Sequence, residues 1–445
     1  MTTSASTALL TDRYELTMID AALADGTADR RCVFEVFARR LPTGRRYGVL
    51  AGTGRLLEAI ADFRFGEQEL DWLREQSVVS EQTLAYLADY RFRGSITGYA
   101  EGELYFPGSP LLVVDATFAD GVILETLILS ILNYDSAVAA AASRMTSAAG
   151  DRPCLEMGSR RAHEAAAVAA ARATAVAGFS ATSNLEAGRR YGLRTIGTAA
   201  HAFTLLHDDE RSAFVSQVAS AGPGTTLLVD TYDVEQGVIT AVDAAGTALG
   251  AVRLDSGDLL TVAREVREQL DGLGATGTRI VVSSDLDEYA IAALAVAPVD
   301  SYGVGTSVVT GSGAPTCGMV YKLVLREGSD GHMHAVAKAS AGGKSSVGGH
   351  KVAGRRIEHG LATEEVVVLS PDSDVPALHQ IAEVDELRPL HVPLVVDGVV
   401  DPTYTGAEGV RRAAERHAAS RLELPRAAWR LSAGDAAIPT EIITV

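Results

Sequence analysis

The sequence predicts an α/β fold whose middle part is a closed or nearly closed barrel of parallel strands. The texture of the chain changes at residue 111, and after residue 145 a unit of apolar strand, polar or glycine-rich loop, and helix recurs along the chain. Seven predicted strand ends follow one another at intervals of roughly 15 to 35 residues, the spacing of βαβ units. Alternating strands and helices favour a parallel sheet with right-handed crossovers, and seven or eight such units favour closure into a barrel.

The first part of the chain mixes helices and strands. Residues 11–17 predict the start of a helix, with Asp12 as a possible cap and Glu15 three positions later. Residues 33–38 alternate like a strand, and 111–114 form another strand candidate. The alanine- and leucine-rich segment 120–145 predicts a helix.

The seven repeating units place polar residues where each predicted strand ends. These ends lie at 156–161, 179–184, 197–201, 229–233, 252–258, 282–285 and 302–306. Helices are predicted over 162–177, 208–219, 259–270 and 287–297. In a barrel of this kind the functional groups sit at the carboxyl ends of the strands, so we expect these residues to share one site.

The last part of the chain no longer repeats the unit of strand, loop and helix. Strands are predicted at 318–325 and 364–369, short strands and loops over 370–402, and a charged surface helix over 409–421. We therefore expect an amino-terminal α/β domain over 1–115, a catalytic barrel over 116–325, and a carboxyl-terminal segment over 326–445 that packs with the amino-terminal domain.

Composition excludes several classes of protein. The 445 residues carry a formal net charge of -18, which argues against nucleic-acid binding. The three cysteines are far apart and form no C-x-x-C pair, so neither a disulfide framework nor a zinc site is expected, and a reducing cytoplasm is favoured. No signal peptide is expected. The apolar stretch 121–132 is too short to span a bilayer and contains Glu125, which predicts a buried or interface helix.

The residues at the predicted strand ends favour an enzyme that acts on a phosphorylated anion. Carboxylates beside a glycine loop suit a Mg²⁺-bound polyphosphate, and backbone N–H groups of 303–306 could hold a phosphate. Arginine binds planar carboxylates or phosphates through paired hydrogen bonds. The side chains concerned are Arg160, Asp230, Arg253, Asp255, Asp258 and Asp285. Each single aspartate could instead cap a helix, and these residue types alone do not fix the reaction.

One histidine follows the third predicted strand end. The sequence GTAAHAF at 197–203 predicts a strand that runs out into a loop and presents His201 to a cavity. A histidine that merely caps a helix or packs is the alternative.

The motifs match a known family when they are taken in order. They are TDRYELTM at 11–18, GSRR at 158–161, GTAAH at 197–201, VDTYD at 229–233, RLDSGD at 253–258, YGVGT at 302–306 and the strand VYKL at 320–323. With these motifs, nearly the whole chain resembles the nicotinate phosphoribosyltransferases, the type II phosphoribosyltransferases of NAD salvage.

This resemblance implies both a fold and a reaction. The fold is an irregular TIM-like α/β barrel plus an α/β domain assembled from the amino- and carboxyl-terminal segments. Nicotinate and 5-phosphoribosyl 1-pyrophosphate give nicotinate mononucleotide and pyrophosphate, with Mg²⁺ as cofactor and coupled ATP hydrolysis, which is a ligase-type classification. The phosphorylated histidine falls on His201. A cytoplasmic homodimer with shared active sites is implied.

The resemblance also assigns individual residues. His201, Asp230 and Asp255 are the implied catalytic residues, and Asp230 is the aspartate expected to orient His201. The implied substrate-binding residues are Tyr14, Arg160, Phe179, Ser183, Thr198, Arg253, Ser284, Asp285, Gly303, Gly305 and Thr306. The exact metal ligands stay open.

Several alternatives remain at this point. A nicotinamide-using relative carries aspartate where this chain has Ser183, and serine tolerates the acid. A barrel aldolase would need a lysine at a strand end, and none is present at the seven ends. A catalytically inactive regulator is the non-enzyme alternative. The family commonly carries Pro-Gly-x-Lys where this chain has GGHK at 348–351, so Lys351 either contacts phosphate or ATP or belongs to a surface loop.

Overall fold

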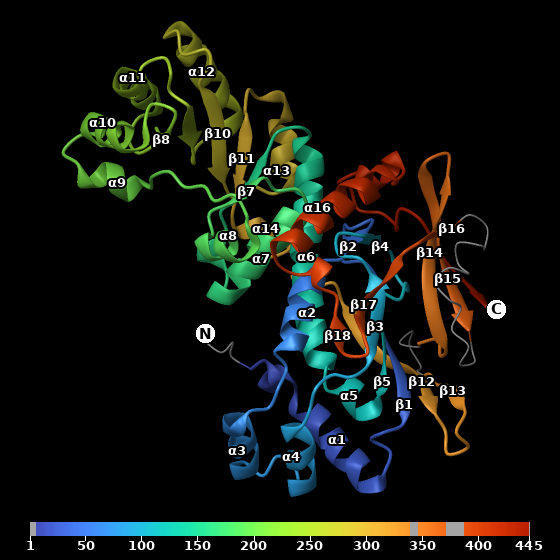
Figure 1. Ribbon diagram of the computed structural model, residues 1–445. Coiled ribbons are helices and arrows are strands. Elements are labelled where there is room, and N and C mark those ends of the chain that lie inside the picture. Colours follow the sequence, from blue (N-terminus) through green and yellow to red (C-terminus); the bar gives the residue numbers. More distant parts are fainter. Residues whose placement is uncertain (1–5, 339–345, 371–386, 445) are drawn as a thin grey trace. The chain divides into compact units, whose positions relative to one another are not determined.

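The computed structural model describes residues 6–338, 346–370 and 387–444, which form two compact units (Figure 1). The first unit combines Met1–Ala140 with Ala314–Val445, and the second is Ala141–Gly313. The sequence analysis placed the corresponding boundaries at 115/116 and 325/326. The first boundary lies later, within the uninterrupted helix α6 (Glu125–Ala149), which belongs to the first unit as far as Ala140.

The amino-terminal part of the first unit follows the predicted order of helix and strand. Helix α1 begins at Arg13, and the backbone N–H of Asp12 donates to Glu15 Oε2 at 3.1 Å, as the cap pattern predicts. The elements are η1 (Ala8–Leu10), α1 (Arg13–Asp25), β1 (Arg31–Ala38), β2 (Gly48–Val49), α2 (Thr53–Ala61), α3 (Glu67–Glu75), α4 (Glu81–Ala88), β3 (Ser95–Tyr99), β4 (Leu104–Tyr105), β5 (Leu112–Thr117) and α5 (Phe118–Val122).

Strands from both ends of the chain meet in one antiparallel sheet of the first unit. Its order is β13-β12-β1-β5-β3-β17-β18, where β3 from the amino-terminal part pairs with β17 from the carboxyl-terminal part. The later strands are β12 (Met319–Glu327), β13 (Met333–Ala335), β17 (His391–Val396) and β18 (Val399–Val400). Both terminal segments therefore contribute to the same unit, and β2 and β4 form a separate antiparallel pair.

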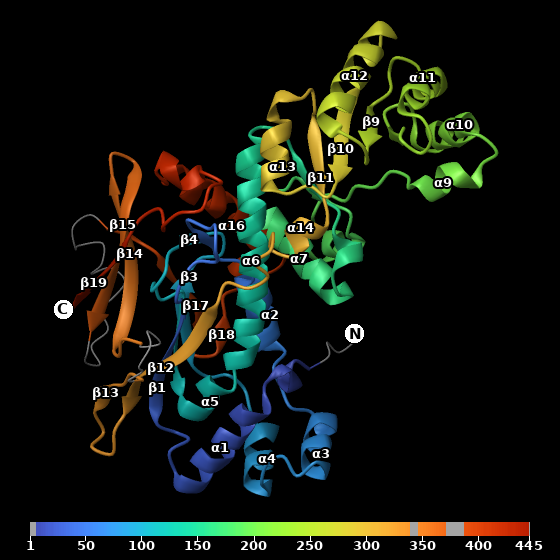
Figure 2. The same ribbon diagram turned by 180° about the vertical axis from the view of Figure 1, so that it is seen from behind.

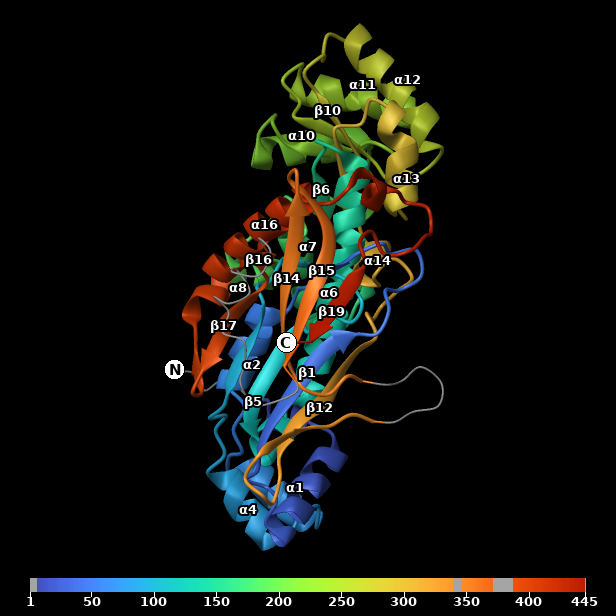
Figure 3. The ribbon, with the colours of Figure 1, turned by 90° about the vertical axis from the view of Figure 1, so that its right-hand side faces the viewer.

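A second sheet of the first unit is built from the carboxyl-terminal part alone. Its order is β16-β14-β15-β19, and β14, β15 and β19 lie side by side in Figure 3. The elements are β14 (His350–Glu358), β15 (Leu361–Ser370), β16 (Leu387–Pro389), η4 (Pro402–Tyr404), α16 (Gly406–Leu422), η5 (Arg426–Trp429) and β19 (Thr440–Thr444). Residues 371–386 of the predicted loop region lie outside the described residues.

Helix α6 carries the most apolar stretch of the chain. With α5 it forms a helical run, Phe118–Ala149, that is long and apolar enough to cross a membrane, but 67% of its most apolar window is buried inside the protein. Leu124, Ile128 and Leu132 belong to the main hydrophobic core. The rings of Phe34 and Tyr321 stack at 5.0 Å in the same core. A buried or interface helix was predicted, and this packing shows a buried one.

The second unit contains a parallel sheet of six described strands. Its order is β7-β6-β11-β10-β9-β8, and helix α12 packs against β10 (Figure 2). The strands are β6 (Cys154–Glu156), β7 (Ala181–Thr182), β8 (Thr226–Leu228), β9 (Ala251–Leu254), β10 (Arg279–Ser284) and β11 (Ser301–Val304). The helical elements are η2 (Ser159–Arg161), α7 (Glu164–Val176), α8 (Leu185–Tyr191), α9 (His201–Leu206), α10 (Glu210–Ala221), α11 (Val234–Ala245), α12 (Leu259–Gly272), α13 (Glu288–Ala293), η3 (Leu294–Val296) and α14 (Thr306–Val309).

The sheet curls as a half-barrel and stays open on one side. The strands neighbour one another in barrel order, because the last strand, β11, pairs with the first, β6. The predicted third strand is reduced to one bridge between Thr182 and Thr195, which leaves no described pairing with β8. Arg194 and Thr195 are exposed, so this segment has little apolar surface to hold a strand in a core.

A buried ion network holds the carboxyl-terminal sheet to the amino-terminal part of the first unit. The guanidinium of Arg355 on β14 is fully buried and donates to Glu103 at 2.9 Å and to Glu365 at 2.7 Å. Arg388 also donates to Glu103. Burial opposes ionisation of Glu103, but the two guanidinium groups outweigh it and lower the pKa of Glu103 to about 2.

We predict that Arg355→Met strongly destabilises the first unit. The substitution leaves Glu103 and Glu365 buried without their main partner, which costs about 3–5 kcal/mol of the free energy of unfolding. Urea unfolding measures this loss. Arg411→Met on α16 is the matched control, because Arg411 pairs with Glu408 and Glu415 on the surface, where solvent screens the charges and loss of a pair changes stability little. Equal effects of the two substitutions contradict the prediction.

A second prediction concerns His391 on β17. The buried imidazole donates through Nε2 to the carbonyl of Pro110 at 2.7 Å, and burial lowers its pKa from 6.5 to about 4. Between pH 6.5 and 4 the unfolded chain takes up a proton that the folded chain does not, so stability falls as the pH falls through this range. We expect His391→Gln, which keeps a donor, to flatten this fall by up to about 1.4 kcal/mol per pH unit. Denaturant unfolding at several pH values measures the slope, and an unchanged slope contradicts the assignment.

Candidate active site

A cavity of about 250 Å³ opens at the carboxyl edge of the parallel sheet in the second unit. Nearly all of its described lining residues are polar, charged or glycine. They are Met157, Arg160, Arg161, Arg253, Asp255, Ser283, Ser284, Asp285, Gly303, Gly305 and Thr306. Eight of the residues predicted from the sequence are among them: Arg160, Arg253, Asp255, Ser284, Asp285, Gly303, Gly305 and Thr306.

Strand pairing explains why these distant residues meet. Strand β11 pairs with β6 on one side and β10 on the other, so Gly303 lies opposite both Leu155 and Ser283. Strand β10 in turn pairs with β9, where Val281 lies opposite Arg253. The carboxyl ends of parallel strands fall on one edge, and the residues after them share one opening.

The cavity is electropositive in an acidic chain. Its lining carries three arginines and two aspartates, which gives a formal charge of +1, whereas the whole chain has -18. Arginine forms paired hydrogen bonds with carboxylates and phosphates. The arrangement therefore suits a small anion.

Arg253, Ser283 and Asp255 form one hydrogen-bonded group within the cavity. Arg253 Nε donates to Ser283 Oγ at 2.7 Å, and Ser283 Oγ donates to Asp255 Oδ1 at 2.6 Å. Arg253 Nη2 also donates directly to Asp255 Oδ1 at 3.1 Å. This group fixes the direction of both charged side chains.

His201 lies at the start of helix α9 and is 41% exposed. Its Nδ1 lies 3.1 Å from Thr231 Oγ1, and its Nε2 lies 4.0 Å from Asp255 Oδ2. Asp230 was expected to orient His201, but its Oδ2 accepts the backbone N–H of Asp255 and the hydroxyl of Ser256, each at 2.8 Å. Asp230 thus fixes the loop that carries Asp255, and Asp255 and Thr231 are the neighbours of the imidazole.

Asp258 has a structural task instead. It caps helix α12 by accepting the N–H of Leu260 at 3.2 Å and the hydroxyl of Thr261 at 2.9 Å. The capping alternative is therefore correct for Asp258. It does not describe the contacts of Asp230 and Asp255.

Two glycines leave no room for a side chain beside the cavity. A Cβ at Gly303 would lie 2.8 Å from Met157 Sδ and 3.0 Å from Ser283 Cβ. A Cβ at Gly158 would lie 2.3 Å from Val309 Cγ1 and 2.9 Å from the carbonyl oxygen of Gly305. The glycine loop and the turn with the arginines therefore pack directly on each other.

The buried carboxylate of Glu156 supports the same turn. It accepts the N–H of Gly158 and the hydroxyl of Thr182. Burial raises the pKa of Glu156 above its ordinary value, and the two hydrogen bonds oppose that shift. Glu156 thus joins the ends of β6 and β7 below the loop that carries Arg160.

Two predicted residues lie near the sheet without lining the cavity. Ser183 directly follows β7, where its N–H donates to the carbonyl of Glu156 at 2.8 Å, and Thr198 is exposed in the loop before α9. Neither is among the lining residues.

Phe179 lies at the other edge of the sheet. It precedes β7, is 6% exposed, and lines a separate small cavity with Thr182 and Leu193. The structure does not bring it to the carboxyl edge with the other predicted residues.

Two further positions belong to the first unit. Tyr14 is 46% exposed at the start of α1, and partial burial together with the neighbouring Glu125 raises its pKa. Lys351 lies within β14, is 3% exposed at its side chain, and forms a buried ion pair with Glu35. Lys351 is therefore neither in a surface loop nor free to hold phosphate.

Four residues at the site were not assigned from the sequence. Met157, Arg161 and Ser283 line the cavity, and Thr231 contacts His201. Each of these residues lies within one of the predicted strand ends, so the sequence indicated that they lie near the site. Only the strand register showed which neighbours in each segment face the cavity.

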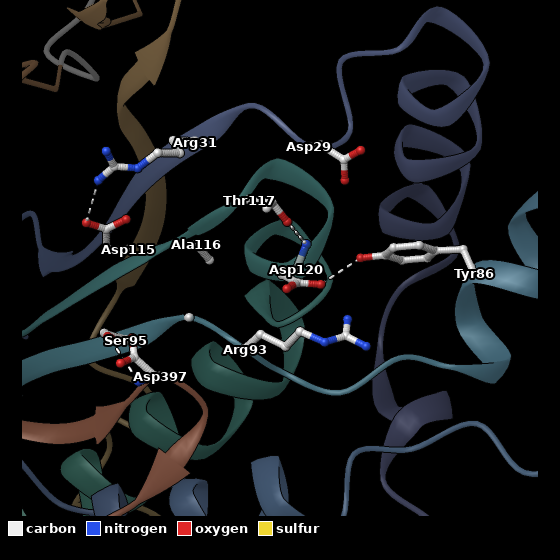
Figure 4. Close-up of a pocket in the computed structure, with 11 residues that line it drawn as sticks. Asp29, Arg31, Tyr86, Arg93, Ser95, Asp115, Ala116, Thr117, Asp120 and Asp397 are labelled. Atoms are coloured by element: carbon white, nitrogen blue, oxygen red, sulfur yellow. Dashed lines mark hydrogen bonds and ion pairs between the residues drawn. The ribbon is translucent and has the colours of Figure 1, made fainter.

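A separate cavity of about 510 Å³ lies in the first unit (Figure 4). Among its lining residues, Asp115 pairs with Arg31 at 3.6 Å, and Tyr86 donates to Asp120 at 2.7 Å. It contains none of the predicted site residues.

The described side chains alone do not form a complete metal site. Within residues 6–338, 346–370 and 387–444, no group of three or more His, Cys, Asp or Glu residues is arranged to hold a metal ion. Mg²⁺ commonly binds through one or two carboxylates together with substrate phosphates, and Asp285 in the cavity offers one such carboxylate.

The parallel half-barrel and its electropositive cavity place this protein in the class of α/β-barrel enzymes that act on small anions. The profile of the nicotinate phosphoribosyltransferase (NAPRTase) N-terminal domain matches residues 9–133. The chain is 57% identical over 446 residues to the nicotinate phosphoribosyltransferase pncB1 of Mycobacterium tuberculosis, covering 98% of this chain and 95% of that one. It is 38% identical over 345 residues to the nicotinate phosphoribosyltransferase of Bacillus subtilis, covering 76% of this chain and 70% of that one.

A solved structure shares the fold. The crystal structure of human nicotinic acid phosphoribosyltransferase aligns with a TM-score of 0.79 at 24% identity, covering 98% of this chain and 97% of that one. On the sequence similarity given above, the chain belongs to the nicotinate phosphoribosyltransferase family.

We predict that Gly303→Ala disrupts the cavity. The added methyl group must displace Met157 or Ser283, and such overpacking costs about 1–3 kcal/mol of stability. Gly197→Ala is the matched control, because a Cβ there meets nothing within 4 Å. Thermal unfolding of both variants tests the difference. A Gly303→Ala variant as stable as Gly197→Ala contradicts the packing described here.

Proposed function

We propose that the protein is a nicotinate phosphoribosyltransferase that couples the transfer to ATP hydrolysis through a phosphorylated His201. It joins nicotinate to 5-phosphoribosyl 1-pyrophosphate and releases nicotinate mononucleotide and pyrophosphate. The observation that carries the proposal is the electropositive cavity that collects eight predicted residues, in a chain similar throughout its length to relatives named for this activity.

The transfer requires no nucleophile from the protein. The pyridine nitrogen attacks C1 of the ribose as the bond from C1 to the pyrophosphate oxygen breaks, and positive charge develops on the sugar ring as in glycoside chemistry. The cavity's carboxylates stabilise that charge. Arg253 binds the carboxylate of nicotinate, Arg160 holds the pyridine ring, and the loop 303–306 binds the 5-phosphate. When bound with the pyrophosphate group, Mg²⁺ would neutralise its charge, and Asp285 is the carboxylate placed to hold it.

The energy coupling uses His201. A nitrogen of its neutral imidazole attacks the γ-phosphorus of ATP, the bond to the β,γ-bridging oxygen breaks, and ADP leaves. Water later cleaves the nitrogen–phosphorus bond and releases phosphate. The exposure of the imidazole and its position beside Asp255 support this role.

Assembly and location follow from the same family resemblance. A homodimer with shared active sites in the cytoplasm is proposed, in which the exposed ring of Tyr14 stacks on the pyridine ring. The nicotinamide-using alternative and an inactive regulator are separated from this proposal by the experiment below.

We expect the purified protein to form nicotinate mononucleotide from nicotinate, and not from nicotinamide or quinolinate, with a higher yield when ATP is present. His201→Ala should remove the ATP stimulation more completely than the transfer itself, because the imidazole takes part only in the ATP step. Product assays with the three pyridines, with and without ATP, measure both effects. Product from nicotinamide alone overturns the substrate, and absence of any product favours the regulator. Equal loss of transfer and stimulation in His201→Ala argues against the phosphohistidine.

A further inference from the structure

A continuous chain of polar contacts joins the two parts of the proposed reaction. At one end, Arg253 is the guanidinium proposed to hold the carboxylate of nicotinate. At the other end, His201 Nε2 lies 4.0 Å from Asp255 Oδ2. Between them, Ser283 accepts from Arg253 Nε at 2.7 Å and donates to Asp255 Oδ1 at 2.6 Å.

The position of Ser283 is set by the sheet. Strands β9 and β10 pair in parallel with Val281 opposite Arg253 and Val282 opposite Leu254. The next residue along β10 is Ser283, beside Asp255 where β9 ends. Ser283 is 4% exposed, so water has little access to the hydroxyl. A hydroxyl is suited to this place because it accepts and donates at the same time.

Asp255 is held so that its two oxygens face different partners. Oδ1 accepts from Ser283 and from Arg253 Nη2, whereas Oδ2 is the oxygen nearest His201. Its backbone N–H is fixed by Asp230 at 2.8 Å. A change in the contacts of Oδ1 therefore changes the charge that Oδ2 offers to the imidazole, without moving the loop.

We propose that Ser283 is a positioning residue that couples occupation of Arg253 by the substrate's carboxylate to phosphoryl transfer onto His201. This inference rests on the proposed function, because it takes Arg253 as the carboxylate-binding residue and His201 as the phosphoryl acceptor.

The physical basis is competition for one guanidinium. With the cavity empty, the charge of Arg253 partly compensates Asp255 through Nη2 and through Ser283. A substrate carboxylate that binds Arg253 takes over this compensation, since charge-assisted bonds to a carboxylate are stronger than those to a hydroxyl. Ser283 then keeps Asp255 in place, and the negative charge of Asp255 acts on His201 more strongly than it does in the empty cavity. This charge stabilises the imidazole as its nitrogen–phosphorus bond forms and the bond to ADP breaks.

The test compares ATP hydrolysis with and without saturating nicotinate. Coupling between two sites corresponds to roughly 5- to 150-fold, and we expect stimulation in this range for the unaltered protein. In Ser283→Ala the stimulation should fall toward onefold, because Asp255 Oδ1 loses one of its two partners. Ser301→Ala is the matched control, because it removes a buried hydroxyl from the amino end of neighbouring β11 and should keep the stimulation.

The outcomes separate this inference from the proposed function. Stimulation that persists in Ser283→Ala overturns the coupling role and leaves the proposed function intact. Absence of both transfer and ATP hydrolysis in the unaltered protein overturns the proposed function, and the coupling with it. A measurement on the unaltered protein covers the case in which Ser283→Ala does not fold: nicotinamide lacks the carboxylate, so stimulation of ATP hydrolysis by nicotinamide equal to that by nicotinate overturns the coupling.

Discussion

The pairing of β11 with β6 is the constraint on which the site depends. It joins the last strand of the parallel sheet to the first, although Val304 and Glu156, which face each other in this pair, are far apart in the chain. The glycine loop after β11 then packs against the turn after β6, where a Cβ at Gly158 has no room. The half-barrel can stay open on the side of Thr195, because the cavity is built from the strands on either side of the β11–β6 pairing.

Charge is distributed unevenly along the chain, and positive charge is concentrated at the cavity of the second unit. An acidic chain repels anions in general, but the lining gathers Arg160, Arg161 and Arg253 with only two aspartates. Asp255 does not simply cancel an arginine. Its contacts with Ser283 and Arg253 fix its orientation, and its second oxygen remains directed toward His201. The carboxylates therefore act as oriented groups within a positive site, which suits a reaction that releases an anion and develops positive charge on a sugar.

The first unit is stabilised differently, through buried ions that connect distant parts of the chain. Arg355 joins Glu103, on the amino-terminal side, to Glu365 within the carboxyl-terminal sheet. The buried pair of Lys351 and Glu35 makes a similar connection. Buried charges are tolerated only with partners, so each pair fixes the register in which the two terminal segments meet. This explains why Lys351, in a loop-like glycine-rich sequence, became a strand residue of the interior.

The amino-acid sequence by itself determined the class of fold and the edge of the sheet at which the site lies. Periodic strands and helices repeat along the chain, and parallel strands necessarily bring their carboxyl ends together. The sequence also indicated that His201 and Asp255 belong to the site, since both follow predicted strands. Only the tertiary structure decided that Asp258 caps a helix, that Phe179 lies at the opposite edge, and that Asp230 holds the loop of Asp255 instead of the imidazole. The physical reason is that a side chain's task depends on strand register and on which partner lies within hydrogen-bond reach, and both are set by contacts between segments distant in the sequence.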